Sequence, residues 1–531
     1  MRRAVDILVL VILLGASGLP AADPPALWLY CPTNLLVGAN VDALGALFVR
    51  AHRAGYTTVL LEDSKFSRLG EMGTAYFDHI ATVKRLAAES HLTIIPAICP
   101  IGYSNDLLAR NPDLAEALPV RKQLFVVAHG MAHVQADPPV ALPALADQRA
   151  WTWKDDVVVP DGDAVRITDN PGNARLVDQV TVAPFREYHI SVDIKTQDYT
   201  GTPEIHILSA ADDLNYTNLG ARASQPWTQE NITFNSLDHT TIAIYFGQWG
   251  PAHGSLWWRN PRLEECGLVN LVRRPGAPLT IIDDTGRALM EGPQIPAISD
   301  PLMGRVTWPG DYDAWHEPPQ VPANLPDGTR LRLSYYHTIT IGDGQVMICL
   351  SEPQTMELIA DHIKRVVAAW GAPGYFLSHD EIRVMDWDQS CLARHLTPGQ
   401  ILADHVARCI ALVRAAAPHA QLWIWSDMFD PNHNAHDHYY RVQGDLAGSW
   451  LGLDPGVTIA LWNSATAGPS SAFFATRGHR LLIAGYYDAP VAGIHDWLRA
   501  TAGRPVDAIM YTTWRGDYSQ LEAFAVAARA P

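Results

Sequence analysis

The stretch Gly374-Tyr-Phe-Leu-Ser-His-Asp-Glu-Ile382 is the segment from which the fold and the candidate site are best predicted. Its apolar run, Tyr375 to Leu377, is followed at once by four polar residues ending in Asp380 and Glu381. An apolar run between turn residues is typical of a buried parallel strand. In a (β/α)8 barrel, catalytic side chains lie where such strands end. Two adjacent carboxyl groups there should have separated pKa values, which suits a neutral acid beside an ionised partner. An ion-paired strand end holding Arg383 is the alternative interpretation.

The bulk composition indicates a globular protein of more than one domain. The chain has 531 residues, of which 48% are hydrophobic and 18% charged, so we expect two or three domains rather than one core. A net charge of −17 argues against nucleic acid or an anionic membrane as partner, because both require a basic surface. The 17 tryptophans suit a carbohydrate partner, although tryptophan also fills cores.

Residues 1–22 have the pattern of a secretory signal. Arg2 and Arg3 precede the apolar run Ile7–Leu14, and small residues follow it. We therefore expect an exported, periplasmic or extracellular protein, with an uncleaved signal anchor as the alternative. Export would permit disulfides, but the six cysteines have no CxxC spacing and predict no particular bridge.

Strands and helices alternate on both sides of a long interruption. Three strands are predicted before it, at Leu27–Tyr30, Thr58–Leu61 and Leu92–Ile98. Five are predicted after it: the opening stretch, Leu422–Trp425, Val457–Leu461, Leu481–Ala484 and Ala508–Tyr511. Helical periodicity separates them, for example at Val41–Ala54, Phe77–Ser90 and Pro353–Trp370. Eight strands that alternate with helical segments in this way predict a (β/α)8 barrel, which is an α/β fold.

The interruption has the pattern of an all-β domain. From about Trp151 to Val272 the chain shows short alternating strands between turns, which predicts an inserted β-sandwich. This part resembles jelly-roll carbohydrate-binding modules at Asn173-Ala-Arg-Leu, at Tyr188–Lys195 and at Gly254–Leu263. The resemblance implies a sandwich more strongly than it implies sugar binding. We predict a signal at 1–22, barrel at 23–120, the insert with connectors at 121–330, and barrel again at 331–531.

Carboxylates and aromatic residues follow several predicted barrel strands, and in a barrel such strand ends converge on one pocket. Glycoside hydrolysis needs a carboxylic acid that reaches the glycosidic oxygen and a second group that stabilises positive charge on the sugar ring. Aromatic rings pack against the apolar face of a sugar. The strand ends therefore favour a glycosidase. The sequence has neither a GxGxxG motif after a strand nor a phosphate-binding loop, so we expect no organic cofactor.

The pair Asp380-Glu381 resembles the Asp-Glu pair at the fourth strand of family 20 hexosaminidases. That resemblance implies Glu381 as general acid and Asp380 as the group that orients a nucleophilic 2-acetamido group. Its other matches are Trp425, Trp462, Trp514 and Tyr486-Tyr487-Asp488. The family has two glycines before the pair where this chain has Ser378-His379, so His379 is expected to fill part of the pocket and leaves the acetamido specificity open.

Other residues keep further mechanisms open. Asp488, at the seventh strand, would be a protein nucleophile if the carboxyl groups lie about 5 Å apart. Asp427 is a third candidate carboxylate. Asp63 either binds sugar hydroxyls or caps the following helix. Arg515 pairs with Asp517 or contacts substrate at the rim.

The favoured function is that of an exported glycoside hydrolase acting on an oligo- or polysaccharide, with substrate assistance on an N-acetylhexosaminide as one mechanism. The first alternative is a carbohydrate-binding barrel protein without catalysis. The second is a metal-dependent hydrolase that uses the loop from His433 to His438, because imidazoles at such spacing bind divalent ions. The favoured function needs no metal.

Overall fold

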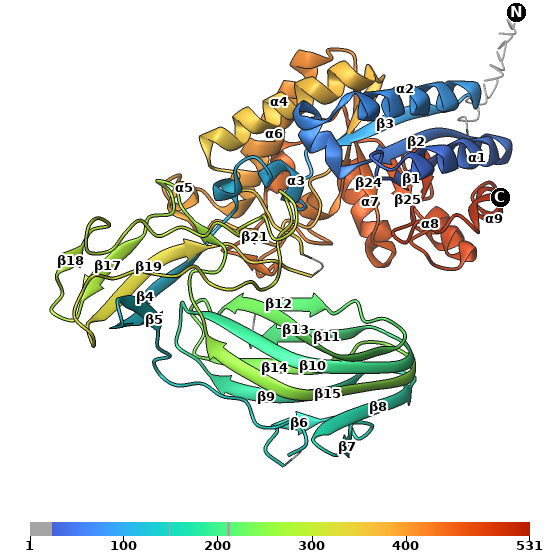
Figure 1. Ribbon diagram of the computed structural model, residues 1–531. Helices are drawn as coiled ribbons and strands as arrows, with labels where there is room; N and C mark the ends of the chain where they lie inside the picture. Colours follow the sequence, from blue (N-terminus) through green and yellow to red (C-terminus); the bar gives the residue numbers. More distant parts are fainter. Residues whose placement is uncertain (1–23, 148, 210–212, 343, 531) are drawn as a thin grey trace, which may run out of the picture.

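The computed structural model describes residues 24–147, 149–209, 213–342 and 344–530. It contains a closed barrel of eight parallel strands, several of which are labelled in the upper part of Figure 1. The barrel order follows the chain order, with the insert between the third and fourth strands. The barrel strands are β1 (Ala26–Pro32), β2 (Tyr56–Glu62), β3 (Thr93–Ile98), β20 (Gly374–Leu377), β22 (Gln421–Trp425), β24 (Val457–Leu461), β25 (Leu481–Ala484) and β26 (Val506–Tyr511). The predicted parallel barrel is confirmed.

Side chains alternate between the two faces of each barrel strand, as the two-residue period of a strand requires. Inward-facing residues form a core of their own inside the barrel, which includes Trp28, Leu60, Phe376 and Trp425. Their chain neighbours, such as Leu29 and Leu377, belong instead to the larger core under the helices. The barrel wall therefore separates an interior layer from a helix layer.

Helices cover the outside of the barrel, although incompletely (Figure 1). They are α1 (Gly38–Ala54), α2 (Thr74–Glu89), α4 (Pro353–Trp370), α6 (Pro398–Ala416), α7 (Ala467–Ala475), α8 (Ile494–Ala500) and α9 (Leu521–Ala527), with the short α3 (Asn105–Leu108) and α5 (Gln389–Leu392) in loops. Between β22 and β24 the described chain forms short 3-10 turns and no α-helix. The strict alternation expected from the sequence is interrupted there.

The all-β insert consists of two facing five-stranded antiparallel sheets, drawn below the barrel in Figure 1. One sheet contains β13 (Gln225–Asn235), β10 (Glu187–Thr200), β15 (Ala252–Glu265), β8 (Ala164–Asn170) and β7 (Val159–Asp161). The other contains β12 (Asp213–Asn218), β11 (Pro203–Leu208), β14 (Thr241–Gln248), β9 (Ala174–Thr181) and β6 (Trp153–Lys154). Alternate residues of both sheets, such as Ile190, Ile207 and Phe246, are buried between them.

A further six-stranded sheet connects the insert to the barrel. It contains β4 (Leu118–Ala128), β5 (Met131–Val134), β16 (Leu271–Val272), β17 (Thr280–Asp283), β18 (Ala288–Leu289) and β19 (Arg330–His337). The chain leaves the barrel along β4 and returns along β19, and these two strands pair antiparallel. Both domain boundaries expected from the sequence, at 120 and 330, fall within strands of this sheet.

The predicted signal at residues 1–22 lies outside the described residues. In the part of the chain that the structure describes, no helix combines the length and the apolar character needed to cross a membrane.

Candidate active site

A cavity of about 350 Å³ lies at the carboxyl ends of the barrel strands. Its size is within the range of small-molecule sites. Its lining comes from all eight barrel strands or the loops that follow them: Tyr30, Glu62, Tyr103, Asp380, Glu381, Trp425, Trp462, Tyr487 and Trp514. Three carboxyl groups and six aromatic rings thus share one pocket.

The aromatic residues form a buried floor and an exposed rim. Tyr30 and Trp425, on the floor, are 4% and 2% exposed, and both rings contact Trp514 with centroids 5.2 and 5.7 Å away. At the rim, Tyr487 and Trp514 are 46% and 42% exposed. The rings of Trp462 and Tyr487 are almost parallel, with 4° between their planes. The cavity therefore presents flat apolar faces that remain accessible from solvent.

Glu381 is held by contacts to both its side chain and its backbone. Oε1 forms an ion pair of 2.7 Å with Arg383 Nη2, and the Tyr103 hydroxyl donates to Oε2. Its backbone has φ +50°, a conformation that non-glycine residues rarely adopt. Gln345 Nε2 donates to its carbonyl at 3.0 Å, and its N–H donates to Asp427. Such strained residues cluster at functional sites when neighbours fix them, as here.

The loop after β3 packs directly on the carboxyl pair. Ile101 N–H donates to the Ser378 carbonyl at 2.9 Å, and a Cβ on Gly102 would lie 1.9 Å from the carbonyl oxygen of Asp380. Glycine is required at position 102 because backbone atoms approach each other there. This approach brings the Tyr103 hydroxyl to Glu381.

Arg383 connects the cavity to the inserted sandwich. Its guanidinium is buried, donates to Gln345 Oε1 and lies 5.2 Å from the ring centroid of Tyr440 and 5.9 Å from that of Tyr216 on β12. Next to it, β21 (Val384–Met385) pairs with β23 (Arg441–Val442). The sandwich thus contributes to the surroundings of the residue that binds Glu381.

Asp427 lies beneath the cavity and is fully buried. Its carboxylate accepts hydrogen bonds from the Glu381 N–H at 2.8 Å, Asn434 Nδ2 at 3.1 Å and Trp462 Nε1 at 3.3 Å. It fixes the backbone of Glu381 and the indole of Trp462 without lining the cavity. Its geometry is that of a positioning residue.

Burial raises the pKa of several carboxyl groups of the site. Burial and the nearby charges of Asp427, Glu62 and Glu381 raise the pKa of Asp380 well above its usual value. Burial raises the pKa of Asp427 to about 6, with the hydrogen bond from the Glu381 N–H opposing the shift. Burial also raises the pKa of Glu62, and the hydrogen bond from Tyr30 opposes it. The raised pKa favours the neutral form of Asp380, while the neighbouring Glu381 is ion-paired with Arg383.

Of the residues selected from the sequence, six line the cavity: Asp380, Glu381, Trp425, Trp462, Tyr487 and Trp514. Asp488 lies behind the rim, where it accepts hydrogen bonds from Thr513 Oγ1 at 2.5 Å and from the N–H groups of Trp514 and Arg515 at 2.7 and 3.2 Å. It shapes the loop that carries Trp514. Arg515 is exposed and outside the lining.

Two other selected residues face away from the cavity. His379 was expected to fill part of the pocket, but it is 0% exposed and lies against His405 on the helix side of the wall. Asp63 accepts hydrogen bonds from the N–H groups of Leu35 and Lys65 and from the Tyr76 hydroxyl, at 2.9, 3.0 and 2.6 Å. It is the N-cap of a 3-10 helix, which matches the capping interpretation.

Three lining residues were missed: Tyr30, Glu62 and Tyr103. Strand alternation contained the signal for two of them, because Tyr30 follows the inward-facing Trp28 by two positions and Glu62 follows Leu60 in the same way. Tyr103 is in a loop, where no such periodicity applies.

The histidine loop does not gather its side chains. His433 packs edge-to-face against Trp462 with centroids 4.5 Å apart, and burial lowers its pKa to about 4. His436 and His438 are exposed. In the described part of the chain, the groups of three or more His, Cys, Asp or Glu with ligand atoms within 4.8 Å of one another do not include this loop.

Known proteins offer only distant likenesses. No protein-family model matches the chain, and no curated protein matches it. Among solved structures, a rhamnosidase from Novosphingobium sp. PP1Y is similar with 11% identity and a TM-score of 0.31, over 95% of this chain and 58% of that one. A β-N-acetylhexosaminidase from Bacteroides fragilis NCTC 9343 has 12% identity and a TM-score of 0.24, over 34% of this chain and 41% of that one.

The insert has a likeness of its own. A carbohydrate-binding module from Cellvibrio mixtus lichenase 5A, solved with cellotriose, has 14% identity and a TM-score of 0.19, over 24% of this chain and 99% of that one. All three scores are low, so the conclusions about function rest on the cavity.

Proposed function

We propose that this protein is a glycoside hydrolase whose reacting groups are Asp380 and Glu381. The observation that carries the proposal is the cavity itself, in which paired carboxyl groups lie among flat aromatic rings at the carboxyl ends of a parallel barrel. One carboxyl group protonates the glycosidic oxygen, and the other stabilises the positive charge of the sugar ring or assists attack on it. The exposed rings of Tyr487 and Trp514 provide apolar faces on which a sugar ring can pack.

The charges of the site bear on which group is the acid. The resemblance to hexosaminidases gave this role to Glu381, with Asp380 as its partner. Arg383 places a positive charge against Glu381, whereas burial and three neighbouring carboxylates raise the pKa of Asp380 and favour its neutral form. We therefore assign the transferable proton to Asp380 and the ionised role to Glu381.

The substrate class remains part of the proposal. An N-acetylhexosaminide whose acetamido oxygen attacks the anomeric carbon is compatible with the cavity, because His379 faces the helix layer and leaves the pocket to other groups. An oligo- or polysaccharide without that group would require attack by a protein carboxylate or by water.

The test is hydrolysis of aryl glycosides, with and without a 2-acetamido group, that differ in the acidity of the departing phenol. An acidic phenol departs without protonation, so Asp380→Asn should reduce turnover of poor leaving groups by ~10²–10⁴-fold and spare the best ones. Glu381→Gln should reduce both alike. Glu71→Gln, which alters a surface ion pair, is the control.

The outcomes separate the assignments. The opposite pattern, with activated substrates spared only in Glu381→Gln, would return the acid role to Glu381. Full turnover in both variants would refute the site. Affinity for sugars without turnover by the wild type would favour the binding-only alternative.

A further inference from the structure

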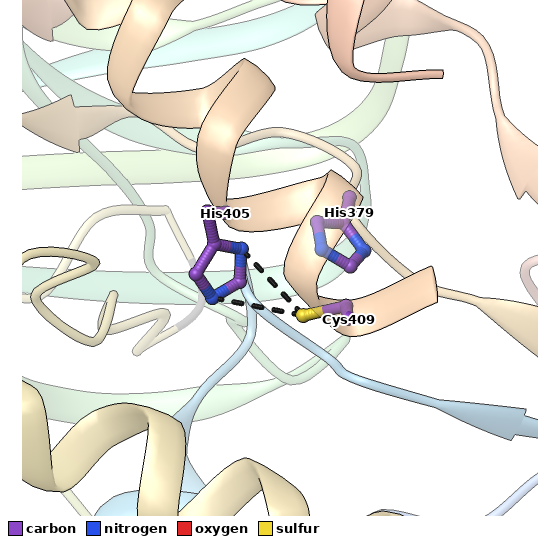
Figure 2. A group of neighbouring side chains, drawn as sticks. All are labelled: His379, His405 and Cys409. Atoms are coloured by element: carbon purple, nitrogen blue, oxygen red, sulfur yellow. Dashed lines mark hydrogen bonds between the residues drawn. The ribbon is translucent and has the colours of Figure 1, made fainter. Parts of the chain in front are cut away.

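Three metal-type side chains meet behind the cavity, on the helix side of the barrel wall. They are His379, which follows β20, and His405 and Cys409 on α6 (Figure 2). One ring nitrogen of each histidine and the cysteine Sγ lie within 4.8 Å of one another. All three residues are 0% exposed.

The local structure explains why these side chains converge. His405 and Cys409 are four residues apart and therefore lie on the same face of α6, the face that packs on the barrel. His379 is one residue before Asp380, and it faces α6 because consecutive residues at a strand end project to opposite sides of the wall.

Ordinary hydrogen bonds do not satisfy this group. Neither ring nitrogen of His379 has a hydrogen-bond partner among the described residues, and such buried groups are rare because each gives up the hydrogen bonds that it makes in water. Cys409 Sγ makes only long hydrogen bonds of 3.8 Å with the two ring nitrogens of His405, which Figure 2 shows as dashed lines.

A second thiol lies beside the first. It belongs to Cys99, which directly follows β3 and forms a side-chain hydrogen bond with Cys409. Cys99 therefore lies beside Cys409 but outside the group whose ligand atoms are all within 4.8 Å of one another.

We propose that His379, His405 and Cys409 bind one Zn²⁺ ion as a structural site, and that the neighbouring Cys99 turns its side chain toward the ion as the fourth ligand. Two cysteines and two histidines around a tetrahedral ion form a closed zinc site, in which Zn–N and Zn–S bonds of about 2.0–2.3 Å place neighbouring ligand atoms about 3.6 Å apart. The observed separation of 3.8 Å between Cys409 Sγ and the His405 nitrogens is close to that value. The cysteines bind as thiolates, and their protons pass to solvent.

The other buried group of this kind is less suitable for a metal ion. It consists of Glu116, Cys349, Asp388 and Cys391. Arg274 already forms ion pairs with Asp388 and with Glu352 there, so a cation of the protein neutralises the carboxylates. The histidine group contains no carboxylate with which an arginine or lysine could pair in this way.

The ion would join the ends of β3 and β20 to α6. Because His379 directly precedes Asp380, the site would fix the strand end that carries the carboxyl pair. Its role would be structural and would not require contact with substrate.

The test is metal analysis of the full-length protein, purified without chelators or metal-affinity resin. We expect about one Zn²⁺ per chain by elemental mass spectrometry. After exchange of Zn²⁺ for Co²⁺, a thiolate-to-cobalt charge-transfer band should appear in the near ultraviolet. Cys409→Ser should lose this band and bind metal at least about tenfold more weakly. Cys391→Ser, a matched substitution in the other group, should retain both.

Several results would overturn the proposal. They are a wild type that retains no zinc and gives no charge-transfer band, a band that survives in Cys409→Ser, and a band lost in Cys391→Ser alone. A disulfide between Cys99 and Cys409, detected by peptide mass mapping without reduction, would also refute it. The measurements on the wild type stand even if Cys409→Ser fails to fold.

Discussion

His379 and Asp380 are consecutive residues that lie in two different polar regions of the molecule. Asp380 faces a solvent-connected cavity with two other carboxyl groups and six aromatic rings. His379 faces the helix layer, where a second imidazole and a thiol lie beside it, and it is outside the lining of that cavity. The end of β20 thus contributes Asp380 to a cavity that is open to ligands and His379 to a closed, buried group of side chains.

The difference shows how a barrel wall separates functions. Burying a polar side chain without hydrogen-bond partners costs free energy for both Asp380 and His379, but the two residues offset this cost in different ways. Asp380 avoids ionisation, because burial and neighbouring carboxylates raise its pKa. His379 has no protein partner for its ring nitrogens among the described residues and would gain one by binding a metal ion. Substitutions on the cavity face should therefore impair turnover, whereas substitutions on the helix face should impair stability.

The largest expected contrast is between Asp380→Asn and Cys409→Ser. Asp380→Asn should reduce turnover by ~10²–10⁴-fold without lowering the thermal unfolding midpoint, because asparagine has the shape of the neutral acid. Cys409→Ser should lower the midpoint, because it removes a ligand of the proposed ion. Turnover assays and calorimetry on both variants check this. Equal losses of stability in the two would contradict the separation of the faces.

A pH series sharpens the contrast on the cavity side. Because the folded-state pKa of Asp380 is raised, folding takes up a proton between the unfolded pKa of about 3.9 and the folded pKa. The stability from this group is complete below about pH 3.9 and is lost as the pH rises through the folded pKa. Asp380→Asn should therefore match the wild type near pH 4 and unfold at a higher temperature near pH 7, which calorimetry at the two pH values measures. At pH 7 the gain in unfolding free energy is about 1.4 kcal/mol for each pH unit between the unfolded pKa of Asp380 and the lower of pH 7 and its folded pKa. An equal difference at both pH values would show that Asp380 does not titrate in this way.

A smaller effect is expected below the cavity, at Asp427. Asp427→Asn should lower kcat by roughly tenfold and change KM little, because an amide cannot accept from Glu381, Asn434 and Trp462 together and one bond costs about 1.4 kcal/mol. Steady-state kinetics give both constants. The control is Asp430→Asn, a buried carboxylate whose bonds are to Asn432. If both variants behaved alike, a general loss of packing would be the cause.

The smallest effect is expected from the sandwich. Tyr216→Leu removes one of the two rings near Arg383, and a contact of this kind contributes about 0.5–1 kcal/mol, so turnover should fall about 2–5-fold. Tyr245→Leu, on β14 of the same domain, is the matched control and should leave turnover unchanged. Identical kinetics for Tyr216→Leu and the wild type would show that the sandwich does not influence the carboxyl pair.

Local patterns were sufficient for several parts of the fold. The eight barrel strands were located from their apolar runs, and the bounds of α4, β24 and β25 match the predicted ranges. The sandwich strands were predicted from alternation and turns. Between β22 and β24, where the repeat of a (β/α)8 barrel would place a helix, the described loops from Met428 to Gly452 form short turns instead.

The site was predicted less completely. Asp380 and Glu381 were found because carboxyl groups after an apolar run are conspicuous, whereas Tyr103 reaches Glu381 only because glycine at 102 lets two loops touch. Arg383 was considered only as an ion pair, and its contact with Tyr216 joins residues far apart in the chain. Cys99 and Cys409 have no meaningful spacing in the sequence.

The sequence by itself determined the strand order, the all-β insert, and the carboxyl and aromatic residues at the strand ends, because these depend on hydrophobic periodicity over a few neighbouring residues. The tertiary structure decided which residues face the cavity, that burial raises the pKa of Asp380, and that two histidines and a cysteine meet behind the barrel wall. Those features depend on burial and on distances between residues that are remote in the chain, and no local pattern encodes them.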